Sequence, residues 1–135
     1  SYLALLSHEV TVENKAKPYP YFLASPAENP KELFSDWSAW AVEWKWDGIR
    51  CQIIKRDGEV FLWSRGEELI NESFPEVLKQ GELLPDGTVI DGELLPFRDG
   101  NVLSFANLQT RLNRKKVSKK DLETTPVSIM TYDLL

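Results

Sequence analysis

The sequence predicts an α+β domain in which a mainly antiparallel sheet is flanked by helices, and two observations carry this prediction. First, the dipeptide Asp57-Gly58 separates two apolar-rich runs, residues 50–56 and 59–64, which is a strong β-hairpin signal. Second, Asn29-Pro30 and Ser104 each begin a segment with helical character, so helices and hairpins are mixed along the chain. A length of 135 residues allows one such domain with a sizeable core.

The first part of the chain is poor in regular structure. Prolines predict an extended lead-in over residues 1–28. At Asn29-Pro30 an asparagine can cap a helix and a proline fits its first turn, and we expect this helix to end near Trp37. A short strand over residues 41–44 should then lead into Lys45.

The two-residue turn fixes the register of the predicted hairpin. Counting back from Asp57-Gly58 places Cys51 opposite Ser64 and, one step further, Arg50 opposite Arg65. Two arginines directly opposite each other on a sheet repel. The pair is explained if an anion, such as a phosphate, sits between them.

The second half continues the alternation of helices and strands. Its predicted elements are a helix over 73–81, a strand over 87–96, a turn at Asp99-Gly100, an amphipathic helix from Ser104, a helical turn over 119–123 and a buried strand over 127–135. Because the last strand has no polar closure, we expect the chain to be a piece of a longer protein.

Composition limits the function classes. The net charge of −5 argues against a simple basic DNA-binding module. The single cysteine excludes an internal disulfide and fits a reducing cytoplasm. The single histidine excludes a His-rich zinc site. No apolar run is long enough to span a membrane, so we expect no membrane partner. Basic residues do concentrate between Arg111 and Lys120, as either a phosphate-contacting patch or the solvated face of a helix.

The most informative segment is Glu43-Trp44-Lys45-Trp46-Asp47-Gly48-Ile49-Arg50. Large apolar neighbours are expected to desolvate the Lys45 amine in part, which lowers a lysine pKa and favours nucleophilic attack. Asp47-Gly48 supplies a tight turn, and Arg50 can bind an anion bidentately. The alternative is a strand that ends in a turn with ordinary exposed charges.

The pattern Lys45-x-Asp47-Gly48-x-Arg50 resembles the nucleotidyl-acceptor motif of ATP-dependent DNA ligases, RNA ligases and mRNA capping enzymes. Further segments match in the expected order: Ser64-Arg65-Gly66, Asp91-Gly92-Glu93-Leu94 and Tyr132-Asp133-Leu134-Leu135. Within this superfamily the chain looks most like a bacterial ATP-dependent DNA ligase, because residues 104–115 and Tyr21-Phe22-Leu23-Ala24 also resemble that group.

The resemblance implies part of a ligase adenylation domain, a nucleotidyltransferase fold comparable to ATP-grasp-like ligase domains. Residues 1–28 would be the lead-in and 29–135 the nucleotide-binding core. Two later motifs, a preceding DNA-binding domain and a following OB-fold are expected in the parent protein. Without them we expect the fragment to be inactive alone.

The resemblance also assigns a reaction. Lys45 would attack the α-phosphate of ATP, form lysyl-AMP and pass the AMP to the 5′-phosphate of nicked double-stranded DNA for sealing. Mg²⁺ would neutralise phosphate charge, and Glu93 would contact this metal or the ribose. Asp47 would orient the lysine loop or act in sealing.

The remaining roles follow from the same resemblance. Arg50 and Arg65 would contact the nucleotide and the nick, Glu43 would accept a hydrogen bond from adenine, and Tyr132 would stack on the base. Trp44 would form a wall of the ATP site. The expected DNA contacts are Ser64, Arg65, Arg111, Arg114 and Lys115.

Two other functions remain open at this point. One is an RNA ligase or capping guanylyltransferase of the same superfamily. The other is a non-catalytic module that binds nucleic acid through the basic residues between Arg111 and Lys120.

Overall fold

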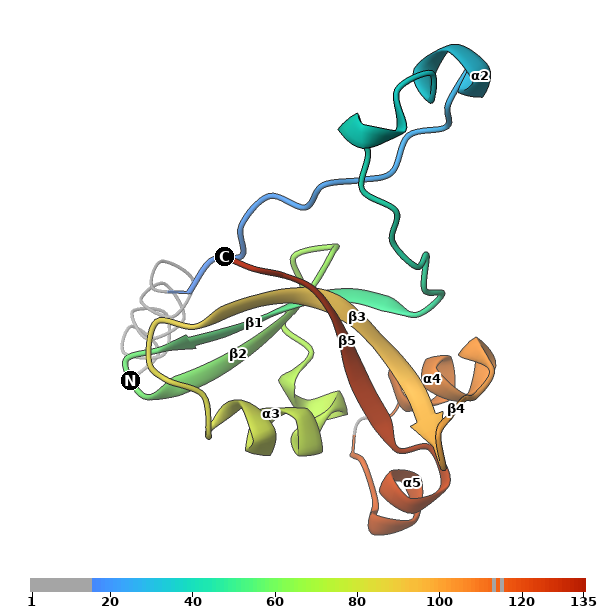
Figure 1. Cartoon of the computed structure of the whole chain (residues 1–135). Coiled ribbons are helices and arrows are strands. Elements are labelled where there is room, and N and C mark those ends of the chain that lie inside the picture. Colours follow the sequence, from blue (N-terminus) through green and yellow to red (C-terminus); the bar gives the residue numbers. More distant parts are fainter. Residues whose placement is uncertain (1–15, 113, 115) are drawn as a thin grey trace.

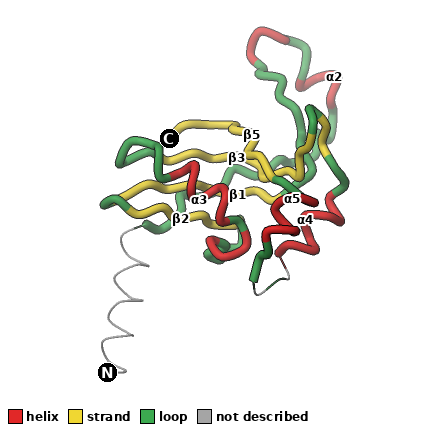
Figure 2. The backbone as a smooth tube through the Cα atoms, turned by 90° about the horizontal axis from the view of Figure 1, so that it is seen from below, coloured by secondary structure: helices red, strands yellow, loops and turns green. Residues whose placement is uncertain are grey.

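The computed structural model describes residues 16–112, 114 and 116–135. These residues form a five-stranded antiparallel sheet with helices beside it (Figures 1 and 2), so the predicted α+β class is confirmed. The strands are β1 (Ile49–Arg56), β2 (Glu59–Ser64), β3 (Val89–Arg98), β4 (Asn101–Val102) and β5 (Val127–Leu134). The α-helices are α2 (Pro30–Leu33), α3 (Pro75–Gly81), α4 (Phe105–Leu112) and α5 (Lys119–Thr124), and the 3-10 turns are η1 (Trp37–Ala39) and η2 (Asn71–Ser73).

The β1–β2 hairpin has the predicted register. Asp57 and Gly58 have φ angles of 52° and 77°, as a tight turn matched to the twist of the strands requires. Cys51 pairs with Ser64. The backbone N–H of Arg65 donates to the carbonyl of Arg50 at 3.0 Å, which extends the pairing one step beyond β2.

Strand β3 is the centre of the sheet. It pairs with β1 on one side and β5 on the other (Figure 2), and its far end forms a short hairpin with β4. The β3–β5 register shifts between Asp91, which pairs with Asp133, and Gly92, which pairs with Thr131. Tyr132 is therefore the extra residue of a β-bulge, a feature that re-aims side chains.

The sheet has two different faces because side chains alternate along each strand. On one face Cys51 and Ile53 join an apolar core with α3 and α4 residues such as Val77 and Leu108. On the other face Ile54 and its neighbours pack against Ala16 of the lead-in, which lies opposite α3, α4 and α5 in Figure 1. No helix of the described residues is long and apolar enough to cross a membrane.

Two predicted elements in the first part of the chain are wrong. Helix α2 ends at Leu33 rather than near Trp37, because the Asp36 side chain accepts a hydrogen bond from Ser38 N at 3.0 Å and caps η1 instead. Residues 41–44 form no strand. Strand β5 is present but half-buried to exposed rather than buried, since β3 is the only strand that pairs with it in the part of the chain that the structure describes.

Candidate nucleotide site

The polar residues of the predicted motifs meet where β1 begins and β2 ends. A cavity of about 270 Å³ at this place is lined by Gly48, Ile49, Arg50, Ser64, Arg65, Gly66 and Glu93. The sequence therefore placed both arginines correctly, because Arg50 and Arg65 line the same cavity. Arg65 is exposed, while Arg50, Ser64 and Gly48 are half-buried.

Arg50 is held in place by neighbours from two other strands. Its Nε donates to Asp91 Oδ1 of β3 at 2.6 Å, and its guanidinium carbon lies 4.4 Å from the centre of the Tyr132 ring. Burial lowers the pKa of Arg50, but Asp91, Tyr132 and Glu93 together outweigh this effect and the pKa lies above its ordinary value. The charge of Arg50 is thus partly balanced by Asp91, a compensation that the hairpin argument did not include.

Glu93 lies directly opposite Arg50 in the β1–β3 ladder. Its side chain is buried, and Oε1 accepts a hydrogen bond from the backbone N–H of Gly48 at 3.1 Å. Burial raises the pKa of Glu93, while the Gly48 N–H and Arg50 oppose this shift. Glu93 is therefore not a solvent-facing strand residue.

Two contacts fasten the segment that carries Lys45 to this site. Gly48 N–H binds Glu93, and the backbone of Trp46 lies close enough to the Tyr132 hydroxyl to lower its pKa. Burial and the charge of Glu93 raise the pKa of Tyr132. Because Lys45 immediately precedes Trp46, its backbone lies next to a fixed point of the site.

Gly48 is the tightest point of this attachment. A Cβ atom at Gly48 would lie 2.1 Å from the carbonyl oxygen of Leu94 and 2.7 Å from Leu95 Cδ2. The backbone of β3 is one of these obstacles, so the clash cannot be relieved by a side-chain rotation alone. Only glycine lets the segment approach β3 closely enough for the Glu93 hydrogen bond.

We expect Gly48→Ala to slow covalent nucleotide transfer to Lys45 by about 100-fold, since a displacement of about 1 Å at a reacting centre has this effect. The measurement is the initial rate of label incorporation from ATP. Gly58→Asn is the control, because it keeps a residue that tolerates a positive φ in a turn outside the cavity. Equal rates for Gly48→Ala and the wild-type protein would contradict this role of Gly48.

The expected desolvation of Lys45 is wrong for this structure. Lys45 is exposed, Trp44 is 78% exposed and Trp46 is half-buried, so the tryptophans do not enclose the amine. Glu43 and Asp47 are also exposed. Since residues 41–44 form no strand, strand alternation does not place Glu43 and Lys45 on one side.

Arg111 and Arg114 of the predicted basic patch form contacts within the protein. Arg111 is 1% exposed, so the prediction that it contacts DNA is wrong. Its guanidinium pairs with both carboxylate oxygens of Glu76 and donates to the carbonyl oxygens of Ser73 at 2.7 Å and Thr125 at 3.0 Å. Arg114 pairs with Asp121 at 3.2 Å.

The other described lysines of the basic patch are exposed, and the Lys119 and Glu123 side chains lie 3.9 Å apart. Lys115, another expected DNA contact, lies outside the described residues. The support for a separate nucleic-acid-binding module is therefore weakened only by the internal contacts of Arg111 and Arg114.

The site can accept a metal only together with a ligand. Among the described residues, no three His, Cys, Asp or Glu side chains form a group that could hold an ion. Mg²⁺ commonly binds one or two carboxylates, substrate phosphates and water, so the single Glu93 carboxylate at the cavity fits such a metal.

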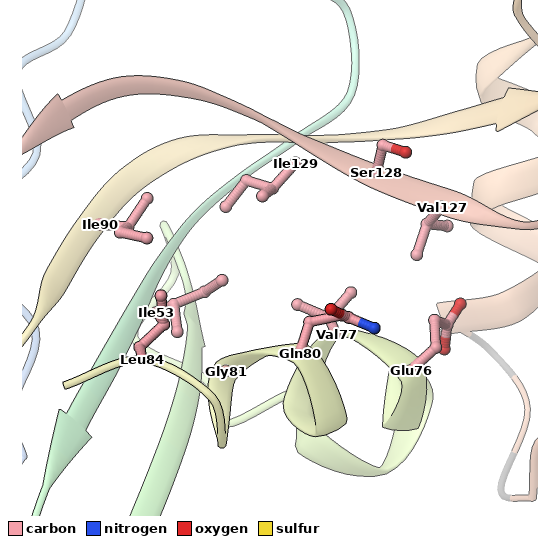
Figure 3. Close-up of a pocket in the computed structure, with 10 residues that line it drawn as sticks. All are labelled: Ile53, Glu76, Val77, Gln80, Gly81, Leu84, Ile90, Val127, Ser128 and Ile129. Atoms are coloured by element: carbon pink, nitrogen blue, oxygen red, sulfur yellow. The ribbon is translucent and has the colours of Figure 1, made fainter. Parts of the chain in front are cut away.

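A larger cavity lies on the opposite face of the sheet. It has a volume of about 460 Å³ and is bounded by α3 and by strands β1, β3 and β5 (Figure 3). Its lining is mostly apolar, with Ile53, Val77 and Ile129 among the side chains shown. Because it gathers no group suited to phosphate chemistry, we assign the candidate site to the smaller cavity.

Sequence reasoning missed two buried polar residues behind the site. Asp91 and Gln52 are 5% and 0% exposed. Asp91 accepts a hydrogen bond from Arg50, and Gln52 in turn donates one to Asp91. A usable signal for Asp91 existed: it lies two residues before Glu93, so both carboxylates project from the same face of a strand. The apolar run around Gln52 gave no such signal.

Comparisons with known proteins identify the family of this chain. The family described as ATP dependent DNA ligase domain matches residues 21–135. A probable DNA ligase of Koribacter versatilis (strain Ellin345) is 39% identical over 98% of this chain and 24% of its own length. A probable DNA ligase of Opitutus terrae is 48% identical over 70% of this chain and 9% of its own length.

Solved structures give the same result. The ligase domain of M. tuberculosis LigD matches with a TM-score of 0.53 and 29% identity, over 69% of this chain and 28% of that one. Mycobacterial DNA ligase D complexed with ATP and MES matches with a TM-score of 0.52 and 31% identity, over the same shares of the two chains. The chain thus spans about a quarter or less of these relatives. It belongs to the family of ATP-dependent DNA ligase domains.

Proposed function

We propose that this chain is the nucleotide-attachment part of an ATP-dependent DNA ligase and acts within a longer protein. The observation that carries the proposal is the meeting of Arg50, Arg65 and Glu93 around one cavity, beside the segment that carries Lys45. Two cations and one carboxylate suit a phosphorylated ligand with a ribose or a metal. A similar structure, mycobacterial DNA ligase D, was solved in complex with ATP, which supports ATP as this ligand.

In the proposed first step the Lys45 Nζ attacks the α-phosphate of ATP. A P–N bond forms, the bond to the β-phosphate oxygen breaks, pyrophosphate leaves, and the amine loses a proton. The product is lysyl-AMP. Because Lys45 is exposed in this structure, the bound nucleotide and further ligase sequence would supply the environment for a neutral amine.

In the following steps the AMP passes to the 5′-phosphate of nicked double-stranded DNA, and the 3′-hydroxyl displaces it to seal the nick. Arg65 and Ser64 lie at the cavity mouth, where they would contact the nicked strand, and Arg50 would contact the nucleotide phosphate. Arg114 would reach DNA only by giving up its pair with Asp121.

The adenosine would be held by residues near the lysine. Glu43 would accept a hydrogen bond from the adenine amino group, and Trp44 would form a wall. The Arg50 guanidinium already covers one face of the Tyr132 ring, so Tyr132 would stack on the base with its other face. Glu93 would contact the ribose or hold Mg²⁺, whose positive charge would lower the barrier to attack on the phosphate, and Asp47 would orient the lysine loop.

The test is nucleotide transfer and nick sealing by the whole ligase that carries this chain. We expect a covalent adduct with labelled ATP and little with labelled GTP, because adenine presents an amino donor to Glu43 where guanine presents a carbonyl oxygen. We also expect sealing of nicked DNA. Transfer from GTP in preference to ATP would instead indicate a capping guanylyltransferase, and sealing restricted to nicked RNA would indicate an RNA ligase.

A further inference from the structure

The buried side chain of Gln52 binds the lead-in segment as a neighbouring strand would. Its Oε1 accepts from the backbone N–H of Tyr19 at 2.8 Å, and its Nε2 donates to the carbonyl of Tyr19 at 3.1 Å. The Gln52 residue is completely buried whereas Tyr19 is 47% exposed, so both bonds are partly shielded from solvent. A lost partner would leave buried polar groups unsatisfied.

The same amide faces the nucleotide site. Gln52 Nε2 lies 3.4 Å from Asp91 Oδ2, and the other oxygen of Asp91 accepts from Arg50 at 2.6 Å. Gln52 is two residues beyond Arg50 on β1, so the two side chains project from the same face. One side chain therefore contacts both the lead-in and the support of Arg50.

The lead-in has additional anchors on this face. We name residues 16–21 the strap. At its start Ala16 is fully buried against Ile54 and Trp63, and at its end the Tyr21 hydroxyl donates to the carbonyl of Trp63 at 3.1 Å. Burial is the main cause that raises the pKa of Tyr21, and Cys51 and Asp91 add to this shift.

We propose that Gln52 is a positioning residue, which fixes the strap and the Arg50–Asp91 pair to each other so that Arg50 is held in the orientation that binds nucleotide phosphate. This inference rests on the proposed nucleotide site and deepens it. The strap does not line the cavity itself, so it would act on the site through the buried Gln52 amide.

The opposite face of β1 offers a matched control. Ile53 is the next residue along the strand, is 4% exposed and packs in the apolar core with Leu62 and Val77. Ile53→Val loosens that core without touching the strap, Asp91 or the candidate site. Gln52→Met keeps a similar volume but removes every hydrogen bond of the amide.

The first measurement is adenylation kinetics of the whole ligase. We expect Gln52→Met to raise the KM for ATP about 5–10-fold, as the loss of a typical hydrogen bond would, with a smaller change in the rate at saturating ATP. Ile53→Val should keep the wild-type KM even though its thermal stability falls. An unchanged KM in Gln52→Met, or equal KM changes in both variants, would overturn the proposal.

The second measurement is amide hydrogen exchange of Tyr19, which needs no catalysis. Its N–H should exchange faster in Gln52→Met than in the wild-type and Ile53→Val proteins, and ATP should slow exchange in the strap of the wild type. Equal exchange of Tyr19 in all three proteins overturns the proposal even if no adduct forms. An absent adduct in the wild type overturns the proposed function instead, so the two failures are distinguishable.

Discussion

Arg111→Ala is expected to destabilise the fold by roughly 3 kcal/mol, the lower part of the range for breaking a buried ion pair. The lower part applies because Arg111 is buried while the Glu76 side chain is 29% exposed. The substitution also removes the donors to the carbonyls of Ser73 and Thr125, which connect α4 to the start of α3 and the segment before β5. The midpoint of thermal unfolding should fall by about 10 °C.

The control is Arg114→Ala, three residues further on. Its side chain is 48% exposed, and its buried partner Asp121 keeps two hydrogen bonds from Ser118, so the loss should remain below about 1 kcal/mol. Arg111→Lys should recover only part of the stability, since an ammonium cannot reproduce the forked contact with Glu76. If Arg111→Ala kept the wild-type unfolding midpoint and instead lost affinity for DNA, Arg111 would be a DNA contact after all.

Lys45→Ala should abolish the covalent nucleotide adduct. The amine is the proposed nucleophile, and the side chain is exposed, so its removal should leave the unfolding midpoint unchanged. Lys45→Arg should also form no adduct, because a guanidinium stays protonated at accessible pH and is not a nucleophile. The measurement is retention of label from ATP on the denatured protein.

Lys79→Ala is the matched control for this loss. Lys79 is an exposed lysine in α3, on the opposite face of the sheet from the candidate site. It should form the adduct at the wild-type rate. An adduct that persisted in Lys45→Ala would show that another residue carries the nucleotide.

Local signals in the sequence were sufficient for the hairpin. Asp57-Gly58 fixes a two-residue turn, and the register then follows by counting, which brought Arg50 and Arg65 to one cavity. The same local reasoning failed for residues 41–44, where the pattern suited a strand but none of the strands in the described residues pairs with it.

Contacts between distant parts of the chain account for the other differences. The compensation of Arg50 by Asp91 spans 41 positions, and the burial of Arg111 depends on Glu76, 35 positions away. Neither partner can be identified by spacing, because each is set by how β3 and α3 pack in three dimensions. Arg111 therefore appeared, from its basic neighbours, to be a surface residue.

The burial of Glu93 is an intermediate case. Its motif indicated a functional carboxylate, and the structure adds that Gly48 N–H holds this carboxylate at the cavity. The need for glycine at position 48 is visible only once the 2.1 Å approach to Leu94 is known. The functional carboxylate at position 93 was thus predictable from the sequence, whereas the close approach of Gly48 to β3 was not.

The most direct test of the proposed function is to locate the nucleotide on the protein by mass spectrometry after incubation of the whole ligase with ATP and Mg²⁺. The peptide that contains Lys45 should gain the mass of one AMP, and acid treatment should remove it, as expected for a bond between phosphorus and a lysine nitrogen. AMP on a different residue, or no covalent nucleotide under conditions in which the ligase seals nicked DNA, would contradict the assignment of this site.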